Sequence, residues 1–100
     1  MKTFGEIIKS KREEQNRLLR EIATLTKIDQ SIISKLENGE RKASRAQVLK
    51  LATVYKLPES DLIVSWQSDK VAFDLLLEND ADKILKAAGS KIKYLKTIKK

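Results

Sequence analysis

The sequence of 100 residues contains no cysteine and no histidine. Without cysteine no disulfide can form, so the chain is not a small secreted fold held together by disulfide bonds. Without either residue type, thiolate catalysis, histidine general-base catalysis and a zinc site with the usual ligands are also excluded. None of the three glycines lies in a loop that could hold phosphates. We therefore expect no enzyme activity, no metal site and no cofactor.

Long apolar runs are missing as well. No stretch approaches the roughly 18 apolar residues of a membrane-spanning helix. Hydrophobic residues nevertheless make up 41% of the chain, which is usual for a globular domain. The first residues, Met1 to Glu6, lack the apolar region of a signal peptide. The expected location is therefore cytoplasmic, with no membrane partner.

Acidic residues are outnumbered by basic ones, 14 against 21. The excess is uneven, because residues 1–65 carry a net charge of +4 and residues 79–100 carry +5. A basic surface attracts polyanions, of which nucleic acid is the commonest. A merely solvated charged surface would give the same composition, so charge alone does not decide between the two.

Proline and glycine are scarce, with one and three residues, and runs that alternate apolar with polar residues are missing. Both features favour helices joined by tight turns, and five short helices are expected within residues 1–65. The expected ranges are Thr3 to Gln15, Leu19 to Leu25, Gln30 to Glu37, a helix from Ser44 through Tyr55, and a short helix from Pro58 through Ile63. The core predicted from their apolar faces is Ile8, Ile22, Ala23, Ile28, Ile33, Leu36, Leu51, Leu57 and Leu62.

The ends of these helices carry local signals. The spacing of a capping box occurs at two helix starts, Thr3 with Glu6 and Ser44 with Gln47. Asp29 is a suitable N-cap for the third helix, and Asn16 suits the left-handed position that ends the first.

Residues 18–36 have the order of a helix-turn-helix: a short helix, a turn and a second short helix. In this motif the second helix enters the major groove of DNA and the first braces it from behind. Ala23 allows the two helices to cross closely, and Ile28 fixes the turn in the core. Ile33 and Leu36 anchor the second helix.

A specific string, Leu36-Glu37-Asn38-Gly39, follows the third helix, and a Leu-Xxx-Leu-Ala string lies downstream at Leu49 to Ala52. Further matching residues are Glu21 to Ala23, Ile28, Ser31, Ile33 to Lys35, and Asp61 with Leu62. With them, residues 4–65 resemble the Cro/phage-repressor family of helix-turn-helix regulators, the xenobiotic-response-element type. The resemblance implies an all-α fold with a five-helix lambda-repressor-like DNA-binding domain in residues 1–65. Residues 66–100 would add one or two C-terminal helices.

The resemblance also implies which residues read DNA bases. Four residues of the third helix would face the groove: Gln30, Ser31, Ser34 and Lys35. Gln30 can bond adenine at two positions and Lys35 can donate to guanine. The alternative is an ordinary polar, solvated helix face. Ile32 is expected to point outward, and a thymine methyl contact, a subunit contact and partial burial all remain open for it.

Phosphate contacts are implied for the segment that follows the third helix, namely Asn38, Arg41, Lys42, Ser44 and Arg45. Such contacts fix the register on DNA but carry no sequence information. The alternative is a loop that is merely soluble.

The chain departs from the family at the start of the second helix. Leu18 and Leu19 stand where the family has a capping residue and a phosphate-binding glutamine, and we expect Arg20 to substitute. Lys27 replaces the frequent turn glycine, and it can still adopt the left-handed conformation at some cost. Arg17 replaces a usually apolar residue, and Leu18 is expected to fill the space.

Arg12 and Glu37 match an ion pair of the family that lies beneath the recognition helix. A bidentate contact between guanidinium and carboxylate would tie the first helix to the end of the third. We interpret this pair as structural.

The last third of the chain predicts two more helices. One covers Trp66 to Glu78, with an inner face of Val71, Ala72, Leu75 and Leu76. The other follows Asp80 and is interrupted by Gly89-Ser90; its apolar stripe is Ile84, Leu85, Ala88, Ile92, Leu95 and Ile98, and its other face is rich in lysine. This extension could pack on the chain's own helices, pair with a second subunit, bind another protein or lie on a membrane surface. Dimerisation is favoured, because one such domain contacts only half of a symmetric operator.

Together these features predict a sequence-specific transcriptional regulator that binds double-stranded DNA as a dimer, through a recognition helix at about residues 30–37. The alternative is an antitoxin-like interaction module whose C-terminal helices bind a partner protein. A phage repressor, a restriction–modification controller and an antitoxin all fit the sequence.

Overall fold

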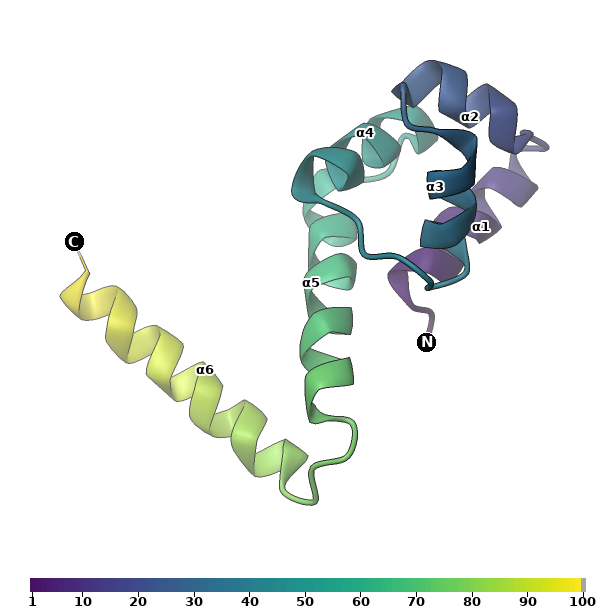
Figure 1. The fold of residues 1–100 in the computed structure, drawn as a ribbon. Helices are drawn as coiled ribbons and strands as arrows, with labels where there is room; N and C mark the ends of the chain where they lie inside the picture. Colours follow the sequence, from purple (N-terminus) through teal and green to yellow (C-terminus); the bar gives the residue numbers. More distant parts are fainter. Residues whose placement is uncertain (100) are drawn as a thin grey trace. The chain divides into compact units, whose positions relative to one another are not determined.

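Residues 1–99 are described by the computed structural model, which contains six helices and no strand within that range (Figure 1). The helices are α1 (Phe4–Glu14), α2 (Leu19–Thr26), α3 (Gln30–Glu37), α4 (Arg45–Tyr55), α5 (Glu59–Leu75) and α6 (Ala81–Ile98). They form two compact units, Met1–Lys70 and the chain from Val71 onward. The all-α fold class predicted from the sequence is confirmed.

The helix starts of α1 and α4 are closed by capping boxes, as predicted. The Thr3 N–H donates to Glu6 Oε1 at 2.9 Å, and the Glu6 N–H donates to Thr3 Oγ1 at 3.3 Å. At α4 the Ser44 N–H donates to Gln47 Oε1 at 3.0 Å, and the Gln47 N–H donates to Ser44 Oγ at 3.2 Å. Each box satisfies two backbone donors that a helix start otherwise leaves free.

Three turns place a non-glycine residue in the left-handed region: Asn16 with φ 54°, Lys27 with φ 59° and Lys56 with φ 57°. The predictions for Asn16 and Lys27 are confirmed, whereas Lys56, which ends α4, was not foreseen. A side chain at positive φ costs free energy that glycine would not.

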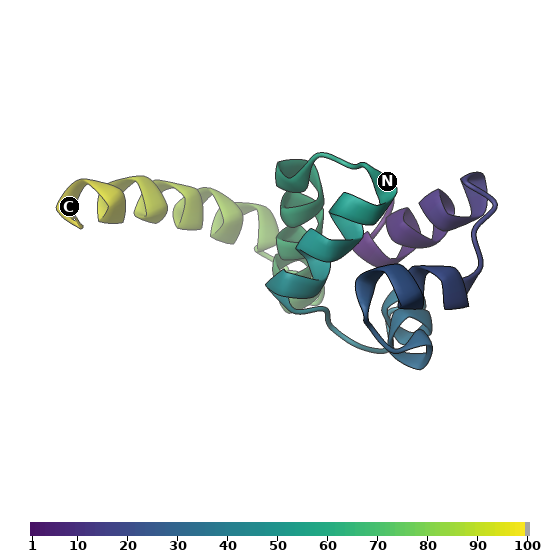
Figure 2. The same ribbon diagram turned by 90° about the horizontal axis from the view of Figure 1, so that it is seen from above.

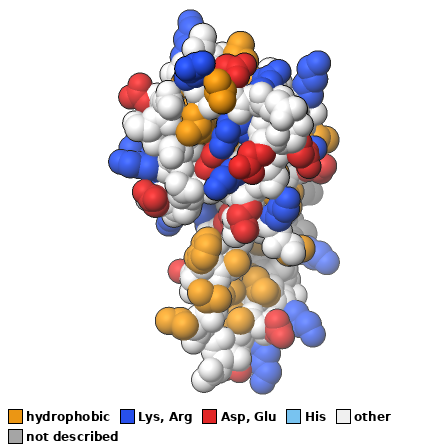
Figure 3. Space-filling model, turned by 90° about the vertical axis from the view of Figure 1, so that its right-hand side faces the viewer, with side chains coloured by type: hydrophobic (Ala, Val, Ile, Leu, Met, Phe, Trp, Pro, Cys, Tyr) orange, Lys and Arg blue, Asp and Glu red, His pale blue; other side chains and the backbone are white. Residues whose placement is uncertain are grey.

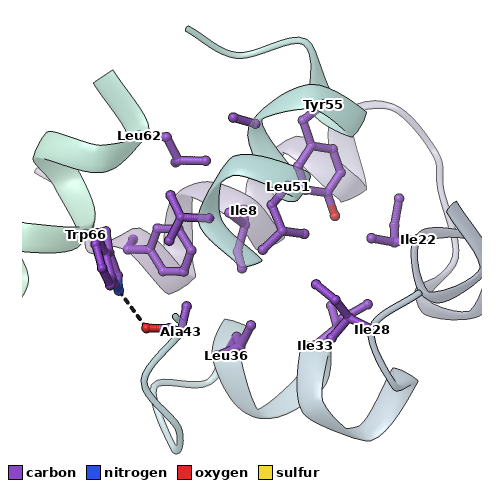
Figure 4. Close-up of a cluster of buried hydrophobic side chains, with 13 residues drawn as sticks. Ile8, Ile22, Ile28, Ile33, Leu36, Ala43, Leu51, Tyr55, Leu62 and Trp66 are labelled. Carbon is purple, nitrogen blue, oxygen red and sulfur yellow. Dashed lines mark hydrogen bonds between the residues drawn. The ribbon is translucent and has the colours of Figure 1, made fainter. Parts of the chain in front are cut away.

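In the first unit, α1 packs against α3 and α4, and α2 packs against the same two helices (Figures 1 and 2). The core that they enclose, drawn in Figure 4, consists of Phe4, Ile8, Ile22, Ile28, Ile33, Leu36, Ala43, Val48, Leu51, Ala52, Tyr55, Leu62 and Trp66. Of the predicted core residues, only Ala23 and Leu57 are partly rather than fully buried.

Gly5 allows α1 to approach the end of α3. A Cβ atom added at this position would lie 2.5 Å from the Leu36 carbonyl oxygen and 2.8 Å from the Glu37 carbonyl oxygen. Any side chain would therefore push the two helices apart. The sequence analysis did not foresee this close approach, which positions the end of α3.

The prediction that one helix ends near Ile63 and another begins at Trp66 is wrong, because α5 is continuous from Glu59 to Leu75. No glycine or proline lies between these residues to break the helix. In addition, Trp66 is buried in the core, and the Phe4 N–H donates to Asp69 Oδ2 at 2.8 Å. These contacts hold α5 on the first unit well beyond Ile63.

The second unit contains the last turn of α5, a connection and α6. The expected interruption of the last helix at Gly89-Ser90 is also wrong, since α6 continues through both residues. One glycine in a helix costs only about 1 kcal/mol. No residue of α6 is buried, and no helix within residues 1–99 is long and apolar enough to cross a membrane.

Candidate nucleic-acid interface

The turn between α2 and α3 is fixed by one buried threonine. Thr26 Oγ1 donates to the Ile22 carbonyl oxygen at 2.7 Å and accepts a hydrogen bond from the Ile28 N–H at 3.3 Å. Ile28 is buried in the core, as predicted, and Lys27 supplies the left-handed residue. The Thr26 hydrogen bonds, the burial of Ile28 and the left-handed Lys27 together hold α2 and α3 at a fixed angle. A helix that is presented to a groove requires such support.

The candidate recognition helix, α3, has one buried face. Ile33, Leu36 and Glu37 are buried, whereas Gln30, Ser31 and Lys35 are exposed. Ser34 is half-buried, so it offers less surface to a ligand than the other three residues expected to contact bases. Ile32 is half-buried and packs against the core. Of the three interpretations left open for Ile32, the structure shows partial burial.

The N-termini of α2 and α3 are capped differently from those of α1 and α4. Asp29 is the N-cap of α3, as expected, but its side chain makes no capping hydrogen bond. Leu18, the N-cap of α2, has no capping side chain, yet its N–H donates to Glu21 Oε1 at 2.9 Å. Half of a capping box is therefore retained at α2, which the sequence analysis did not foresee.

Arg17 and Leu18 differ from the prediction. Leu18 does not fill the usual apolar space, because 49% of its surface is exposed. Arg17 is half-buried, and its Nη1 donates to the Val54 carbonyl oxygen at 3.2 Å. A guanidinium can be accommodated at this half-buried position because its head meets a backbone acceptor. Arg20, expected to contact phosphate, is exposed in the first turn of α2.

Arg12 and Glu37 are brought together beneath α3. Arg12 Nε donates to Glu37 Oε2 at 2.8 Å, and Arg12 Nη2 donates to Glu37 Oε1 at 3.0 Å. A third bond runs from Arg12 Nη1 to the Arg17 carbonyl oxygen at 3.0 Å. The side chains are 14% and 4% exposed. One guanidinium thus joins α1, the end of α3 and the segment before α2.

The pKa values of two groups are shifted here, that of Arg12 in the pair and that of the nearby Tyr55. The hydrogen bond to Glu37 raises the pKa of Arg12 above its ordinary value, so the guanidinium remains charged. Tyr55 lies in the core, and its hydroxyl has no hydrogen-bond partner within the described residues. Burial, and secondarily the charge of Glu37, raise the pKa of Tyr55 to about 12.

The segment between α3 and α4 carries the residues expected to contact phosphate. Asn38, Arg41, Lys42, Ser44 and Arg45 are all exposed. Between them, Ala43 is buried, and its carbonyl oxygen accepts a hydrogen bond from Trp66 Nε1 at 3.0 Å (Figure 4). The segment is therefore fixed at its centre, while the charged side chains on both sides are exposed.

Trp66, which the sequence analysis placed at the start of a separate helix, lies within α5 and is buried in the core of the first unit. Besides its bond to Ala43, its ring lies 3.7 Å from Lys70 Nζ and 5.6 Å from the Arg45 guanidinium carbon, measured to the ring centroid. Both distances are within the range of cation–π attraction. The hydrogen-bond partner of Trp66 is the carbonyl of Ala43, 23 positions earlier in the sequence, so no local sequence pattern indicates this contact.

The site has no cluster of carboxylates that could bind a metal ion within the described residues. Within residues 1–99, no three acidic side chains lie close enough together to hold a metal ion. What the site offers is a polar helix face and a set of cations on its flanking segments. This chemistry suits a polyanion that presents both phosphates and hydrogen-bonding edges.

Comparison with known proteins agrees with this geometry. A family model described as "Helix-turn-helix" matches residues 8–62, from within α1 to the first turn of α5. The HTH-type transcriptional repressor RghR of Bacillus subtilis (strain 168) is 34% identical over 64 residues, which cover 63% of this chain and 47% of that protein. The chain thus spans about half the length of this curated relative. No solved structure matches.

Proposed function

This chain belongs to the helix-turn-helix family, and from that premise we propose that it is a transcriptional regulator that binds double-stranded DNA at a specific operator. The observation that carries the proposal is the division of α3. Its buried face is anchored by Ile33, Leu36 and the Arg12–Glu37 pair, and its other face is polar and exposed. A helix held in this way can enter a major groove without losing its own support.

Base reading in this proposal is performed by α3. Gln30 and Lys35 have the chemistry for adenine and guanine edges, and both are exposed. Ser31 is exposed and can reach either a base or a phosphate. Ser34 is half-buried, so its contribution is restricted to a base edge that lies close to the helix.

Phosphate binding is performed by the segments on both sides of α3. Arg20 supplies a cation before it, and Arg41, Lys42 and Arg45 supply three after it, with Asn38 and Ser44 as neutral donors. These contacts set affinity and register for any sequence. The proposed division of labour therefore separates specificity in α3 from affinity in its flanks.

The regulator acts as a dimer in this proposal. One helix-turn-helix covers one half-site, and two copies related by a two-fold axis cover a symmetric operator. The exposed apolar side chains from Val71 onward support a protein contact in that part of the chain. The relative from Bacillus subtilis is a repressor by its name, and we propose that this chain represses as well.

Selection of bound duplexes from a random DNA pool tests the proposal with the full chain. We expect enrichment of an inverted repeat whose half-sites are about one helical turn apart. Binding of the enriched duplex should weaken steeply as salt rises from about 50 to 200 mM, because phosphate contacts release counterions. A pool that remains random after repeated selection would contradict sequence-specific binding.

A protein-interaction module is the second candidate, because no residue of α6 is buried. In that case the C-terminal helices neutralise a toxin-like partner and DNA binding is secondary. The protein encoded by the neighbouring gene is the partner to test. A defined complex between the two full chains, combined with no enrichment in the DNA selection, would favour this candidate over the regulator.

A further inference from the structure

Charges of opposite sign are fully separated along the second unit. Residues 71–82 contain four acidic residues and no basic one: Asp74, Glu78, Asp80 and Asp82. Residues 83–99 contain six lysines and no acidic residue: Lys83, Lys86, Lys91, Lys93, Lys96 and Lys99. We call these the acidic segment and the lysine segment. An acidic segment is thus followed directly by a basic segment of similar length.

Both segments also expose large apolar side chains. In the acidic segment these are Val71, Phe73, Leu76 and Leu77, between 46% and 94% exposed. In the lysine segment they are Ile84, Leu85, Ile92, Tyr94, Leu95 and Ile98, between 37% and 63% exposed. Hydrophobic side chains at the surface are visible in the lower part of Figure 3. Ten large apolar side chains exposed within one small unit indicate an interaction site.

The charge pattern limits what can cover this surface. If α6 packed on α6 of a second copy through the apolar stripes, five lysines from each helix would lie along the edges of the contact, and their mutual repulsion would oppose the gain from apolar burial. An acidic segment against a lysine segment brings the opposite charges together instead. Charges at the edge of an interface determine its pairing more than its strength.

We infer that a second copy of this chain covers the surface in a crossed arrangement, with the lysine segment of each copy packed on the acidic segment of the other. A two-fold axis makes the two contacts identical, so one dimer satisfies both segments of both chains. The inference rests on the proposed dimer and specifies how its subunits meet. It also gives the acidic residues a function, because they select the partner segment.

Two charge-reversal variants of the full chain test the crossed arrangement. The first is Asp74→Lys with Glu78→Lys, and the second is Lys93→Glu with Lys96→Glu. Sedimentation equilibrium at low salt should give a dissociation constant at least tenfold higher for each variant alone than for the unaltered chain. An equimolar mixture should recover near-original affinity, because the reversed acidic segment of one variant meets the reversed lysine segment of the other.

A matched control keeps the change in net charge but places it in the first unit. Glu13→Lys with Glu40→Lys reverses two exposed acidic residues there and should leave the dimer constant unchanged. Circular dichroism of every variant checks that the helices are retained. Recovery in the mixture is an independent check, since two misfolded chains would not restore a dimer.

Other outcomes overturn the inference. If the first variant dimerises as tightly as the unaltered chain, α6 pairs with α6 and the crossed arrangement is wrong. If the unaltered chain stays monomeric at all concentrations, the two segments pair within one chain or bind a different protein. The DNA selection remains separate from these results. A monomer that still enriches an operator overturns the crossed dimer alone, whereas a crossed dimer that enriches nothing overturns the proposed regulator alone.

Discussion

The two units of this chain use apolar residues in opposite ways. All thirteen buried hydrophobic residues lie in Met1–Lys70, whereas no residue from 71 to 99 is buried. Both units have amphipathic helices, so an apolar stripe specifies that a helix forms but not what covers it. In the first unit the covering helices belong to the same chain. In the second, the cover that we propose belongs to a second copy.

This contrast predicts that removing an interior contact costs much in the first unit. Arg12→Ala should lower the free energy of unfolding by about 3–5 kcal/mol, because it leaves the buried Glu37 carboxylate unpaired. Urea denaturation measures the difference. The exposed pair of Lys11 and Glu14, 3.3 Å apart, provides the matched control. Lys11→Ala should cost less than about 1 kcal/mol, as surface ion pairs do, and equal losses for the two variants would mean that the Arg12 pair is not buried.

Glycine-to-alanine substitution should have opposite signs in the two units. Gly5→Ala places a Cβ atom 2.5 Å from the Leu36 carbonyl oxygen and should destabilise the protein by roughly 1–3 kcal/mol through overpacking. Gly89→Ala in α6 meets nothing within 4 Å, and it should stabilise the helix by up to about 1 kcal/mol. Thermal melts of both variants measure the effects. Two shifts of the same sign would show that the units do not differ in packing at these positions.

The proposed function divides the DNA-contacting residues of the first unit into base-reading and phosphate-positioning residues, and DNA-binding measurements test this division. Gln30→Ala should cost about 1–3 kcal/mol on the selected operator and relax the preference at one base pair. Arg41→Ala should weaken binding to all duplexes alike and make the salt dependence less steep. Fluorescence anisotropy with operator and shuffled duplexes distinguishes the two. A uniform loss for both variants would remove the proposed division between α3 and its flank.

The smallest expected effect concerns pH. Because the pKa of Tyr55 is raised to about 12 in the folded protein, folded chains keep this proton at a pH where unfolded chains lose it. The contribution of protonated Tyr55 to the free energy of unfolding is therefore fully present below about pH 10, the ordinary pKa of tyrosine. It is lost as the pH rises toward 12.

Tyr55→Phe removes both this titration and a buried hydroxyl without a partner. At pH 7 its free energy of unfolding should differ from that of the unaltered chain by less than about 1 kcal/mol. Between pH 10 and 11 it should lose less stability than the unaltered chain. Parallel urea denaturation at each pH provides the comparison, and identical pH profiles would show that the Tyr55 hydroxyl is solvated.

Local signals were sufficient to predict most of the first unit. The capping boxes at Thr3 and Ser44 and the left-handed residue at Lys27 are encoded within a few residues, so α1 to α4 begin and end close to where the sequence predicts. The Arg12–Glu37 pair came from resemblance to a family, since 25 positions separate the two residues.

Contacts between distant segments were not predictable in the same way. Nothing next to Gly5 indicates that the Leu36 carbonyl will lie against it, and nothing next to Trp66 indicates the Ala43 carbonyl. The incorrect break in α5 has the same origin, because Trp66 was assigned by its neighbours in sequence rather than by its contacts in the core.

The contact of Trp66 with the segment after α3 also has an optical consequence. It is the only tryptophan in the chain, so the indole emission of the protein comes from one known place. Two cations and a backbone carbonyl surround its ring, and one of those cations, Arg45, is a proposed phosphate ligand. If DNA draws Arg45 from the ring, the emission wavelength or intensity will change. In that case the proposed operator binding can be followed in real time through this tryptophan, without an attached dye.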